Sequence, residues 1–369
     1  MVYKGFKDIK LSRLGMGNMR LPKTSDDFRA PVDYPKAKEI IDFAMANGIN
    51  YYDTAYVYHG GDSEKFLGET LPNYPRESYY LATKYIIHSS PDYKAVFEEQ
   101  LQRLKTDYID FYLLHAVMDN TYQQYIDSGC IAYFEEQKAK GRIKYFGFSN
   151  HSKTENLKKF LELRDWDFCQ MQLNYYDWVY GSTKEQYEIL SQKGIPIMAM
   201  TPVRGGRLSG LSPASEKVLK DAKADRSIVS WAFYWLKRLS GVQVILSGMS
   251  TLDQIKENVP FFASDEALSD TEEKTLFEAC DVFRKEVQVP CNACRYCFEG
   301  CPAKIDIVKY LEVYNKYKTD GDFALGGINN IESEGKHTDC IACGVCNERC
   351  PQSIDIKSIM AELIEKTKK

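Results

Sequence analysis

The sequence has no apolar run that approaches the roughly 20 residues of a membrane-spanning helix. It also lacks a marked excess of charge of one sign, because 48 basic and 52 acidic side chains leave a formal net charge of −4. Such a balance gives no electrostatic reason to bind nucleic acid or an anionic membrane surface. The opening residues Met1-Val2-Tyr3-Lys4-Gly5 lack the apolar core of a signal peptide. We therefore expect a cytoplasmic protein whose partners include no nucleic acid and no membrane.

Cysteine is scarce outside two short runs. Of 11 cysteines, only Cys130, Cys169 and Cys280 lie elsewhere, and disulfides are rare in the cytosol. The other eight share one spacing, which is that of the two-cluster bacterial ferredoxin run. The two runs are Cys291-x2-Cys294-x2-Cys297-x3-Cys301-Pro302 and Cys340-x2-Cys343-x2-Cys346-x3-Cys350-Pro351. They predict two [4Fe–4S] clusters and a protein that handles electrons.

The last cysteine of each run is expected to bind the cluster of the other run. The predicted ligand sets are Cys291, Cys294, Cys297 with Cys350, and Cys340, Cys343, Cys346 with Cys301. Zinc is the rival metal. Zinc sites usually take their four ligands as two separated pairs. Three cysteines in CxxCxxC spacing, followed by Cys-Pro, favour the [4Fe–4S] cubane instead.

From residue 14 to about 263 the sequence alternates strand-like and helix-like stretches. The predicted strands are 14–20, 49–55, 79–85, 108–115, 143–150, 168–175, 195–202 and 242–250. The predicted helices are 35–47, 63–71, 92–105, 122–140, 153–163, 183–193, 227–239 and 252–262. Strands as continuously apolar as Ile109-Asp110-Phe111-Tyr112-Leu113-Leu114 are typical of parallel sheets covered on both faces.

Eight strand–helix units in about 250 residues favour a closed (β/α)8 barrel. An open doubly wound sheet is the alternative. Such a sheet typically has a GxGxxG turn after its first strand, and residues 15–20 do not complete that pattern. A short hairpin is predicted over 3–11, and an amphipathic helix over 270–286. Two more helices are expected near the cysteine runs, at 305–317 and 356–366. We predict an α/β protein with a barrel domain, 1–270, and a linker helix with a mainly helical dicluster ferredoxin-like domain, 271–369.

Polar side chains are predicted at the C-terminal ends of successive barrel strands, where the chemistry of such barrels lies. Asp53, Lys84 and His115 end the second, third and fourth strands, and Tyr58 follows Asp53 in the next loop. A buried ammonium needs a partner, and Asp53 is the candidate for Lys84. Such a pair beside a tyrosine would lower the pKa of the phenol and equip it to donate a proton to a carbonyl oxygen.

Asp53-Thr54-Ala55-Tyr56-Val57-Tyr58, with Lys84 and His115, resembles the catalytic tetrad of the aldo-keto reductases. The resemblance covers residues 1 to about 265, and the cysteine runs make the chain resemble a subgroup with a C-terminal dicluster domain. It implies a (β/α)8 barrel that binds NADP or NAD. It also implies hydride transfer between nicotinamide and a small carbonyl or alcohol substrate, with Tyr58 as the proton donor.

The resemblance also implies where the nucleotide binds. Gly147-Phe148-Ser149-Asn150 is similar to the family's turn that holds the carboxamide, and Gln170 matches the glutamine that completes this contact. Thr201-Pro202-Val203-Arg204-Gly205-Gly206 is similar to the pyrophosphate loop. The full implied set is Asn18, Met19, Asp53, Ser149, Asn150, Gln170, Met200, Thr201, Pro202, Val203, Gly205, Ser247, Gly248, Ser250, Gln254 and Asn258.

Three departures from the family pattern bear on function. Met200 stands where many relatives stack a tyrosine on the nicotinamide, and the loop after Tyr58 is extended by His59-Gly60-Gly61-Asp62. Ser250 and Gln254 replace the basic residues that usually hold a 2′-phosphate, which weakens the case for NADP and leaves both nucleotides open. The clusters of such a reductase are expected to exchange electrons with a redox protein as partner. One alternative is an electron-transfer protein whose barrel binds nicotinamide without carbonyl turnover. Another is that the clusters are structural or sense oxygen.

Overall fold

The computed structural model describes residues 1–25, 30–286 and 289–368. The contacts within the chain divide it into two compact units. The first consists of Met1–Pro202 and Ser230–Ser269, and the second of Val203–Val229 and Asp270–Lys369. The barrel strands all belong to the first unit and the cysteine runs to the second. Within the described ranges, no helix combines the length and apolar character needed to cross a membrane.

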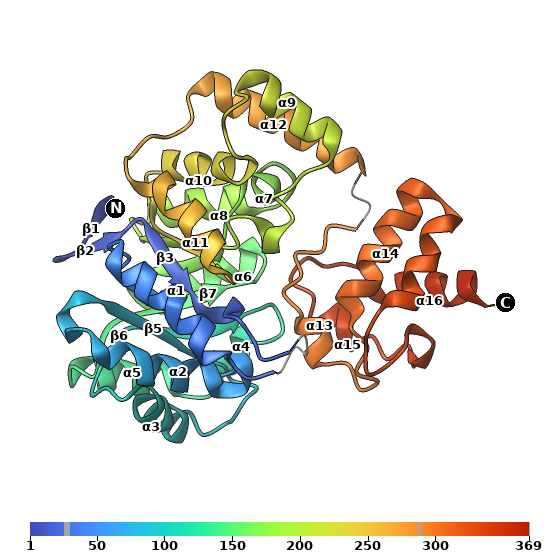
Figure 1. Ribbon diagram of the computed structural model, residues 1–369. Coiled ribbons are helices and arrows are strands. Elements are labelled where there is room, and N and C mark those ends of the chain that lie inside the picture. Colours follow the sequence, from blue (N-terminus) through green and yellow to red (C-terminus); the bar gives the residue numbers. More distant parts are fainter. Residues whose placement is uncertain (26–29, 287–288, 369) are drawn as a thin grey trace. The chain divides into compact units, whose positions relative to one another are not determined.

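The first unit is built around a closed barrel of eight parallel strands, seen at the centre of its ribbon in Figure 1. The strands follow one another around the barrel in chain order, and β10 closes it against β3. This confirms the predicted (β/α)8 fold. The bounds are β3 Leu14–Gly17, β4 Tyr51–Asp53, β5 Tyr80–Tyr85, β6 Ile109–Val117, β7 Ile143–Asn150, β8 Cys169–Gln172, β9 Ile197–Met200 and β10 Val242–Ser247.

The N-terminal hairpin closes one end of the barrel interior. Strands β1 (Tyr3–Phe6) and β2 (Ile9–Ser12) pair antiparallel, as predicted. The buried Phe6 ring lies among Tyr51, Phe111 and Phe168, with its centroid 5.3 Å from that of Phe111. The interior at this end is therefore packed with side chains, and the opposite end is left for chemistry.

Helices cover the outside of the barrel (Figure 1). Their bounds are α1 Tyr34–Ala46, α2 Asp62–Thr70, α3 Tyr93–Leu104, α4 Tyr122–Asp127, α5 Cys130–Ala139, α6 Thr154–Leu161, α7 Tyr175–Tyr180, α8 Thr183–Gln192, α10 Ile228–Arg238 and α11 Leu252–Asn258. Short 3-10 turns are η1 Asn18–Arg20, η2 Tyr58–Gly61, η3 Leu71–Asn73, η4 Arg76–Ser78 and η6 Val259–Phe262.

Several sequence-based boundaries in this unit were wrong, and two of them change the kind or number of elements. The helix expected over 122–140 is two helices, because Gly129 adopts a left-handed conformation, with φ of +77°, between α4 and α5. The strand expected over 168–175 ends at Gln172, and α7 begins three residues later. Asn174 caps α7, since its side chain accepts a hydrogen bond from the Asp177 N–H.

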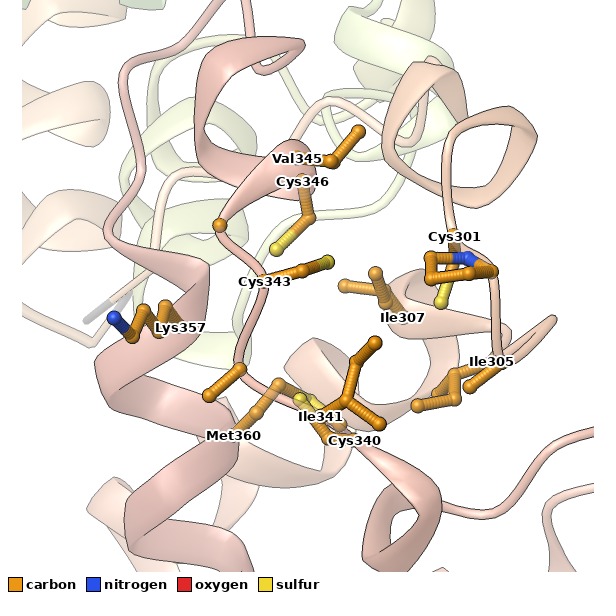
Figure 2. A pocket seen from close by; sticks show the side chains of 14 residues that line it. Cys301, Ile305, Ile307, Cys340, Ile341, Cys343, Val345, Cys346, Lys357 and Met360 are labelled. Atoms are coloured by element: carbon orange, nitrogen blue, oxygen red, sulfur yellow. The ribbon is translucent and has the colours of Figure 1, made fainter.

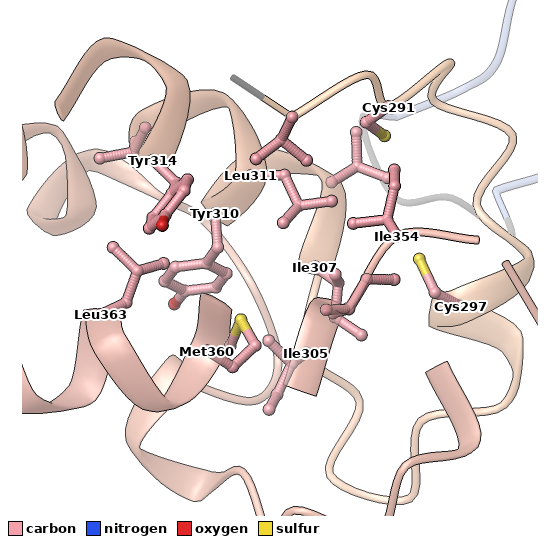
Figure 3. Packing of buried hydrophobic residues seen from close by; sticks show 14 of the residues in the cluster. Cys291, Cys297, Ile305, Ile307, Tyr310, Leu311, Tyr314, Ile354, Met360 and Leu363 are labelled. Carbon is pink, nitrogen blue, oxygen red and sulfur yellow. The ribbon is translucent and has the colours of Figure 1, made fainter. Parts of the chain in front are cut away.

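The second unit is mainly helical. Its helices are α9 Pro213–Ala222, α12 Asp270–Glu286, α13 Tyr296–Glu299, α14 Ile307–Asp320, α15 Val345–Glu348 and α16 Ile356–Thr367, with 3-10 turns η5 Arg204–Gly206, η7 Asp322–Asn330 and η8 His337–Asp339. Figure 3 shows its core, in which Leu311 and Tyr314 of α14 and Met360 and Leu363 of α16 gather.

Residues 203–229 leave the barrel after β9 and pack in the second unit. The Ser215 hydroxyl in α9 donates to the Ala279 carbonyl of α12 at 2.9 Å, and Arg226 pairs with Glu272 of the same helix at 2.9 Å. The segment that follows a barrel strand is thus anchored on the helix that leads into the cysteine runs.

Candidate active site

The polar residues predicted at the strand ends come together at the C-terminal end of the barrel. The Lys84 ammonium donates to Asp53 Oδ2 at 2.6 Å and to the Thr54 carbonyl at 2.6 Å. Lys84 is 0% exposed and Asp53 3% exposed. Burial lowers the pKa of the Lys84 ammonium, and the Asp53 carboxylate opposes that fall. Removing one partner of such a buried pair typically costs about 3–5 kcal/mol.

Tyr58 begins the 3-10 turn η2 beside this pair. The Lys84 Nζ atom lies 5.1 Å from the centroid of the Tyr58 ring, and the ring lies edge-on to His115 with centroids 5.7 Å apart. Tyr58 is partly exposed, while the other three residues are buried. The phenol is therefore the member of the group that an incoming molecule can reach.

His115 lies in an irregular stretch of β6 next to this site. The register between β6 and β7 shifts between Leu114 and Val117, and Ala116 takes a φ of +52°. An alanine in the left-handed region is strained, and bulges and strain of this kind cluster at functional sites. The Ser149 hydroxyl of β7 accepts a hydrogen bond from the Ala116 N–H at 2.7 Å, and Tyr125 donates to the His115 carbonyl. These bonds hold the bulge in place.

Two histidines near Lys84 are kept neutral. Burial holds the pKa of His115 well below its usual value, and the charges of Lys84 and His151 lower it further. Burial and the Lys84 charge lower the pKa of His151 to about 4. His151 directly follows the predicted carboxamide turn, and sequence reasoning missed it, since a histidine after that turn carries no motif of its own.

The pH profile of carbonyl turnover should therefore show no titration of His115 or His151 near the ordinary histidine pKa of 6.5. Both pKa values lie below the ordinary 6.5 of histidine, so protons bind only in more acidic solution. As the pH falls towards 4, protonation is easier in the unfolded chain than in the folded barrel, and the folded state loses stability. The measurement is the pH profile of kcat/KM at fixed nucleotide. A break near pH 6.5 that disappears in His115→Gln would contradict this assignment.

Several buried polar atoms at this end of the barrel lack a hydrogen-bond partner in the described part of the chain. They are Asn18 Oδ1, Asp53 Oδ1, His115 Nδ1, Gln170 Oε1 and Thr201 Oγ1. Buried polar groups are normally satisfied, so a group of orphaned atoms at a strand-end site indicates a polar ligand. A nicotinamide with its carboxamide and ribose has the donors and acceptors that would fit them.

The predicted carboxamide turn is only partly open to a ligand. Asn150 uses both polar atoms of its side chain within the protein, with Nδ2 donating to Gln186 at 3.2 Å and Oδ1 accepting from the Ser152 hydroxyl at 2.8 Å. Gln170 lies beside Ser149 in the β7–β8 register, and among the described residues its Nε2 makes only a long contact of 3.6 Å, to the Met200 sulfur. Gln170 is thus more available to a carboxamide than Asn150.

The remaining predicted nucleotide residues surround the ends of β3, β9 and β10. Asn18, in η1, donates to the Asp53 carbonyl at 3.0 Å, and Met19 follows it. Thr201 adopts a φ of +55° at the start of a loop that continues through Pro202, Val203 and Gly205.

At the predicted adenosine end, the Ser250 N–H donates to Gln254 Oε1 at 2.7 Å, and Asn258 Nδ2 donates to the Ser247 hydroxyl at 3.4 Å. The carbon stem of Arg20 lies against Gly248, where an added Cβ would meet it at 3.4 Å. A cationic side chain therefore lies at this end, which sequence reasoning missed because Arg20 is distant in the chain.

The two cysteine runs of the second unit share one backbone conformation. The residue before the second cysteine of each run, Ala293 or Ala342, has a φ of +55°, and the residue after it, Arg295 or Gly344, also has a positive φ. The residue three positions after the last cysteine repeats the pattern, at Lys304 and Ser353. Strained backbone of this kind persists where a loop must wrap around a bound group.

The thiols predicted to bind the second cluster line a single pocket. Cys340, Cys343 and Cys346 share it with Cys301 from the first run, together with apolar side chains such as Ile307 and Met360. In Figure 2 the four labelled cysteines lie around one space. The structure therefore brings together the interlaced set rather than the four cysteines of one run.

The other set is buried more deeply. Repulsion from the neighbouring thiolates of Cys291 and Cys350 adds to the burial that raises the pKa of Cys294, which places these sulfurs near one another. Burial, these three thiols and Cys346 of the other set raise the pKa of Cys297. Burial raises the pKa of the Cys294 thiol to about 12. Thiolates this far from water need a cation to stabilise them, which the irons of a bound cluster would supply.

The spacing of the sulfur atoms bears on the choice of metal. Within the described ranges, no three Cys, His, Asp or Glu side chains converge closely enough to hold a single ion. A zinc ion draws its four ligands around one atom. A cubane instead spreads its ligands over several irons. The all-cysteine donor sets and the spacing of the two runs accord with [4Fe–4S] clusters.

Comparison with known proteins identifies the families whose models match the chain. The model of the aldo/keto reductase family matches residues 13–280, and that of a 4Fe-4S dicluster domain matches residues 290–354. The oxidoreductase YqkF of Bacillus subtilis is 29% identical over 305 residues, which cover 74% of this chain and 94% of that protein. The NADH-specific methylglyoxal reductase of Escherichia coli is 25% identical over 332 residues, covering 76% and 98%. The holo form of an aldo-keto reductase from Bacillus halodurans is a structural neighbour at 29% identity and a TM-score of 0.64, covering 76% and 96%.

Proposed function

The chain belongs to the aldo/keto reductase family and carries a C-terminal 4Fe-4S dicluster domain, and from this we propose that it is an NAD(P)H-dependent oxidoreductase that reduces a small carbonyl compound or oxidises the corresponding alcohol. We assign the chemistry to Asp53, Tyr58, Lys84 and His115. The buried Lys84–Asp53 pair beside the partly exposed Tyr58 carries the proposal. We propose residues 1–270 as the reductase domain and 271–369 as the cluster domain. Residues 203–229 belong to the reductase domain in sequence but pack in the second unit.

In the proposed reaction the protein supplies the proton and the orientation. A bound nicotinamide dinucleotide supplies the hydride that adds to the carbonyl carbon. The Tyr58 hydroxyl donates its proton to the carbonyl oxygen, so that an alcohol forms, and the Lys84 ammonium stabilises the phenolate that remains. Asp53 holds Lys84 in place, and the neutral His115 orients the carbonyl oxygen by a hydrogen bond. A proton from solvent then restores Tyr58, and the reverse sequence oxidises an alcohol.

For the C-terminal domain we propose two [4Fe–4S] clusters on the interlaced cysteine sets. The pocket that gathers Cys301 with Cys340, Cys343 and Cys346 supports this count. Such clusters exchange single electrons, whereas nicotinamide moves two as a hydride, so we propose a separate redox protein as the partner of the clusters. We further propose a cytoplasmic location, with which the buried, reduced thiols of Cys130 and Cys169 accord.

Turnover assays with both nucleotides test the reductase proposal. The protein is purified without oxygen, iron and sulfide are quantified, and NADH or NADPH oxidation is followed with a panel of small aldehydes and ketones that includes methylglyoxal. We expect turnover, with a higher kcat/KM for NADH, because Ser250 and Gln254 bond to each other and carry no charge. A tenfold preference for NADPH would contradict this and indicate that Arg20 holds a 2′-phosphate. Rapid reduction of the clusters without turnover of any carbonyl would favour the electron-transfer alternative.

A further inference from the structure

The loop proposed to bind the pyrophosphate carries a buried arginine. Arg204 begins the 3-10 turn η5 and is 2% exposed. Its backbone has a φ of +49°, and Gly205 and Gly206 follow with values of +68° and +96°. A non-glycine residue in this region is strained and is kept there by its surroundings. The contacts of the guanidinium show what those surroundings are.

The Arg204 guanidinium joins both ends of one cysteine set. Its Nη2 atom donates to the Pro290 carbonyl at 2.6 Å and to Gln352 Oε1 at 2.8 Å. Pro290 immediately precedes Cys291, and Gln352 lies two residues after Cys350. These two cysteines come from different runs and belong to the same proposed ligand set. One side chain therefore connects the phosphate-binding loop with the two chain segments that hold the first cluster.

We propose that Arg204 is a positioning residue that couples occupancy of the phosphate-binding loop to the reduction potential of the first cluster, and not to that of the second. The inference rests on the proposed function, since it requires a pyrophosphate in the loop and clusters on the cysteine sets. No electron passes between nucleotide and cluster in this coupling. One electron enters the cluster from an external donor, and no covalent bond forms or breaks.

The sign of the coupling follows from charge. A guanidinium stays protonated at every accessible pH, and a buried positive charge stabilises the more negative, reduced state of a cluster. Arg204 should thus raise the potential of the first cluster. A bound pyrophosphate brings negative charge to the same loop and should lower that potential. Linkage then requires that reducing the cluster weakens nucleotide binding by the same factor. A tenfold change in affinity corresponds to about 59 mV for a one-electron couple.

The test uses ADP-ribose, which carries the pyrophosphate but has no nicotinamide to exchange electrons. Its binding to the oxidised holoprotein is measured by calorimetry. The potentials of the two clusters are then followed by electron paramagnetic resonance in anaerobic titrations with dithionite, with and without saturating ADP-ribose. We expect a lower potential for one cluster, equivalent to a roughly tenfold change in affinity, and an unchanged potential for the other. Arg204→Gln should lower the potential of that same cluster and abolish its response to ADP-ribose.

Arg207 provides the matched control. It lies on the same loop but pairs at the surface with Glu312 of α14, at 3.4 Å. Arg207→Gln should keep the wild-type potentials and the response to ADP-ribose. Arg204→Lys keeps a positive charge and should therefore keep part of the rise in potential that Arg204 causes. If ADP-ribose binds but shifts the potential of neither cluster, or shifts both potentials equally, the coupling is refuted. This outcome is measured on the wild-type protein, so it holds even if Arg204→Gln fails to assemble clusters. If ADP-ribose does not bind, the proposed phosphate loop is wrong and the coupling falls with it.

Discussion

Replacing Tyr58 with Phe should lower kcat for carbonyl reduction by roughly 10²- to 10⁴-fold, the range that a positioned general acid supplies. The substitution removes one oxygen atom and keeps the ring that lies beside His115 and over Lys84. Binding of the nucleotide should be little affected, because Tyr58 is assigned to the substrate side of the reaction. Steady-state kinetics at saturating NADH, with the nucleotide dissociation constant measured separately, would show a loss in kcat alone.

Tyr56→Phe is the matched control for this substitution. The Tyr56 hydroxyl donates to Glu99 Oε2 at 2.7 Å, and the Arg103 guanidinium stacks on its ring, so it is engaged outside the tetrad. It lies two residues away in the same segment and should keep wild-type turnover. If Tyr58→Phe retained full activity, or if both variants lost it equally, Tyr58 would not be the proton donor.

The second large effect concerns how the cysteines share the clusters. If the ligand sets interlace, Cys301 and Cys340 serve the same cluster, so replacing both with Ser should remove one cluster and leave about four of about eight irons per chain. Replacing Cys301 and Cys297 together should damage both clusters and leave little iron. The two double variants differ by one position and remove the same number of thiols. Iron and sulfide analysis after anaerobic purification measures the outcome.

Independent clusters would reverse this result. If each run held its own cluster, the Cys297 and Cys301 variant would keep half of the iron and the Cys301 and Cys340 variant would lose nearly all. Because metal ligation commonly supplies folding energy to small domains, the variant that loses both clusters should also unfold its C-terminal unit at lower temperature. Circular dichroism of the helices in that unit would report this loss.

The sequence located the catalytic candidates because their positions follow from strand periodicity. Asp53, Lys84 and His115 each come at or near the end of an apolar strand, and a parallel barrel brings such ends together. The spacing of the cysteine runs was equally informative, since it is a property of the local chain. What both signals share is that they need no knowledge of distant contacts.

Other features depend on tertiary contacts that a local pattern does not encode. The segment 203–229 follows a barrel strand, yet it packs in the second unit through Ser215 and Arg226. Asn150 fits the carboxamide turn by spacing, but Gln186 and Ser152 occupy its polar atoms. Arg204 lies within the predicted pyrophosphate loop, but its proposed coupling role depends on contacts with Pro290 and Gln352, which lie far along the chain.

The central claim is that the barrel transfers a hydride from nicotinamide directly to a carbonyl carbon. It is tested most directly with NADH or NADPH carrying deuterium on the transferable side of C4, and mass spectrometry of the alcohol formed by the oxygen-free holoprotein. Direct hydride transfer would place one deuterium on the carbinol carbon of each product molecule and leave the clusters oxidised. Alcohol that forms without deuterium, or only when the clusters are reduced by an added donor, would contradict it.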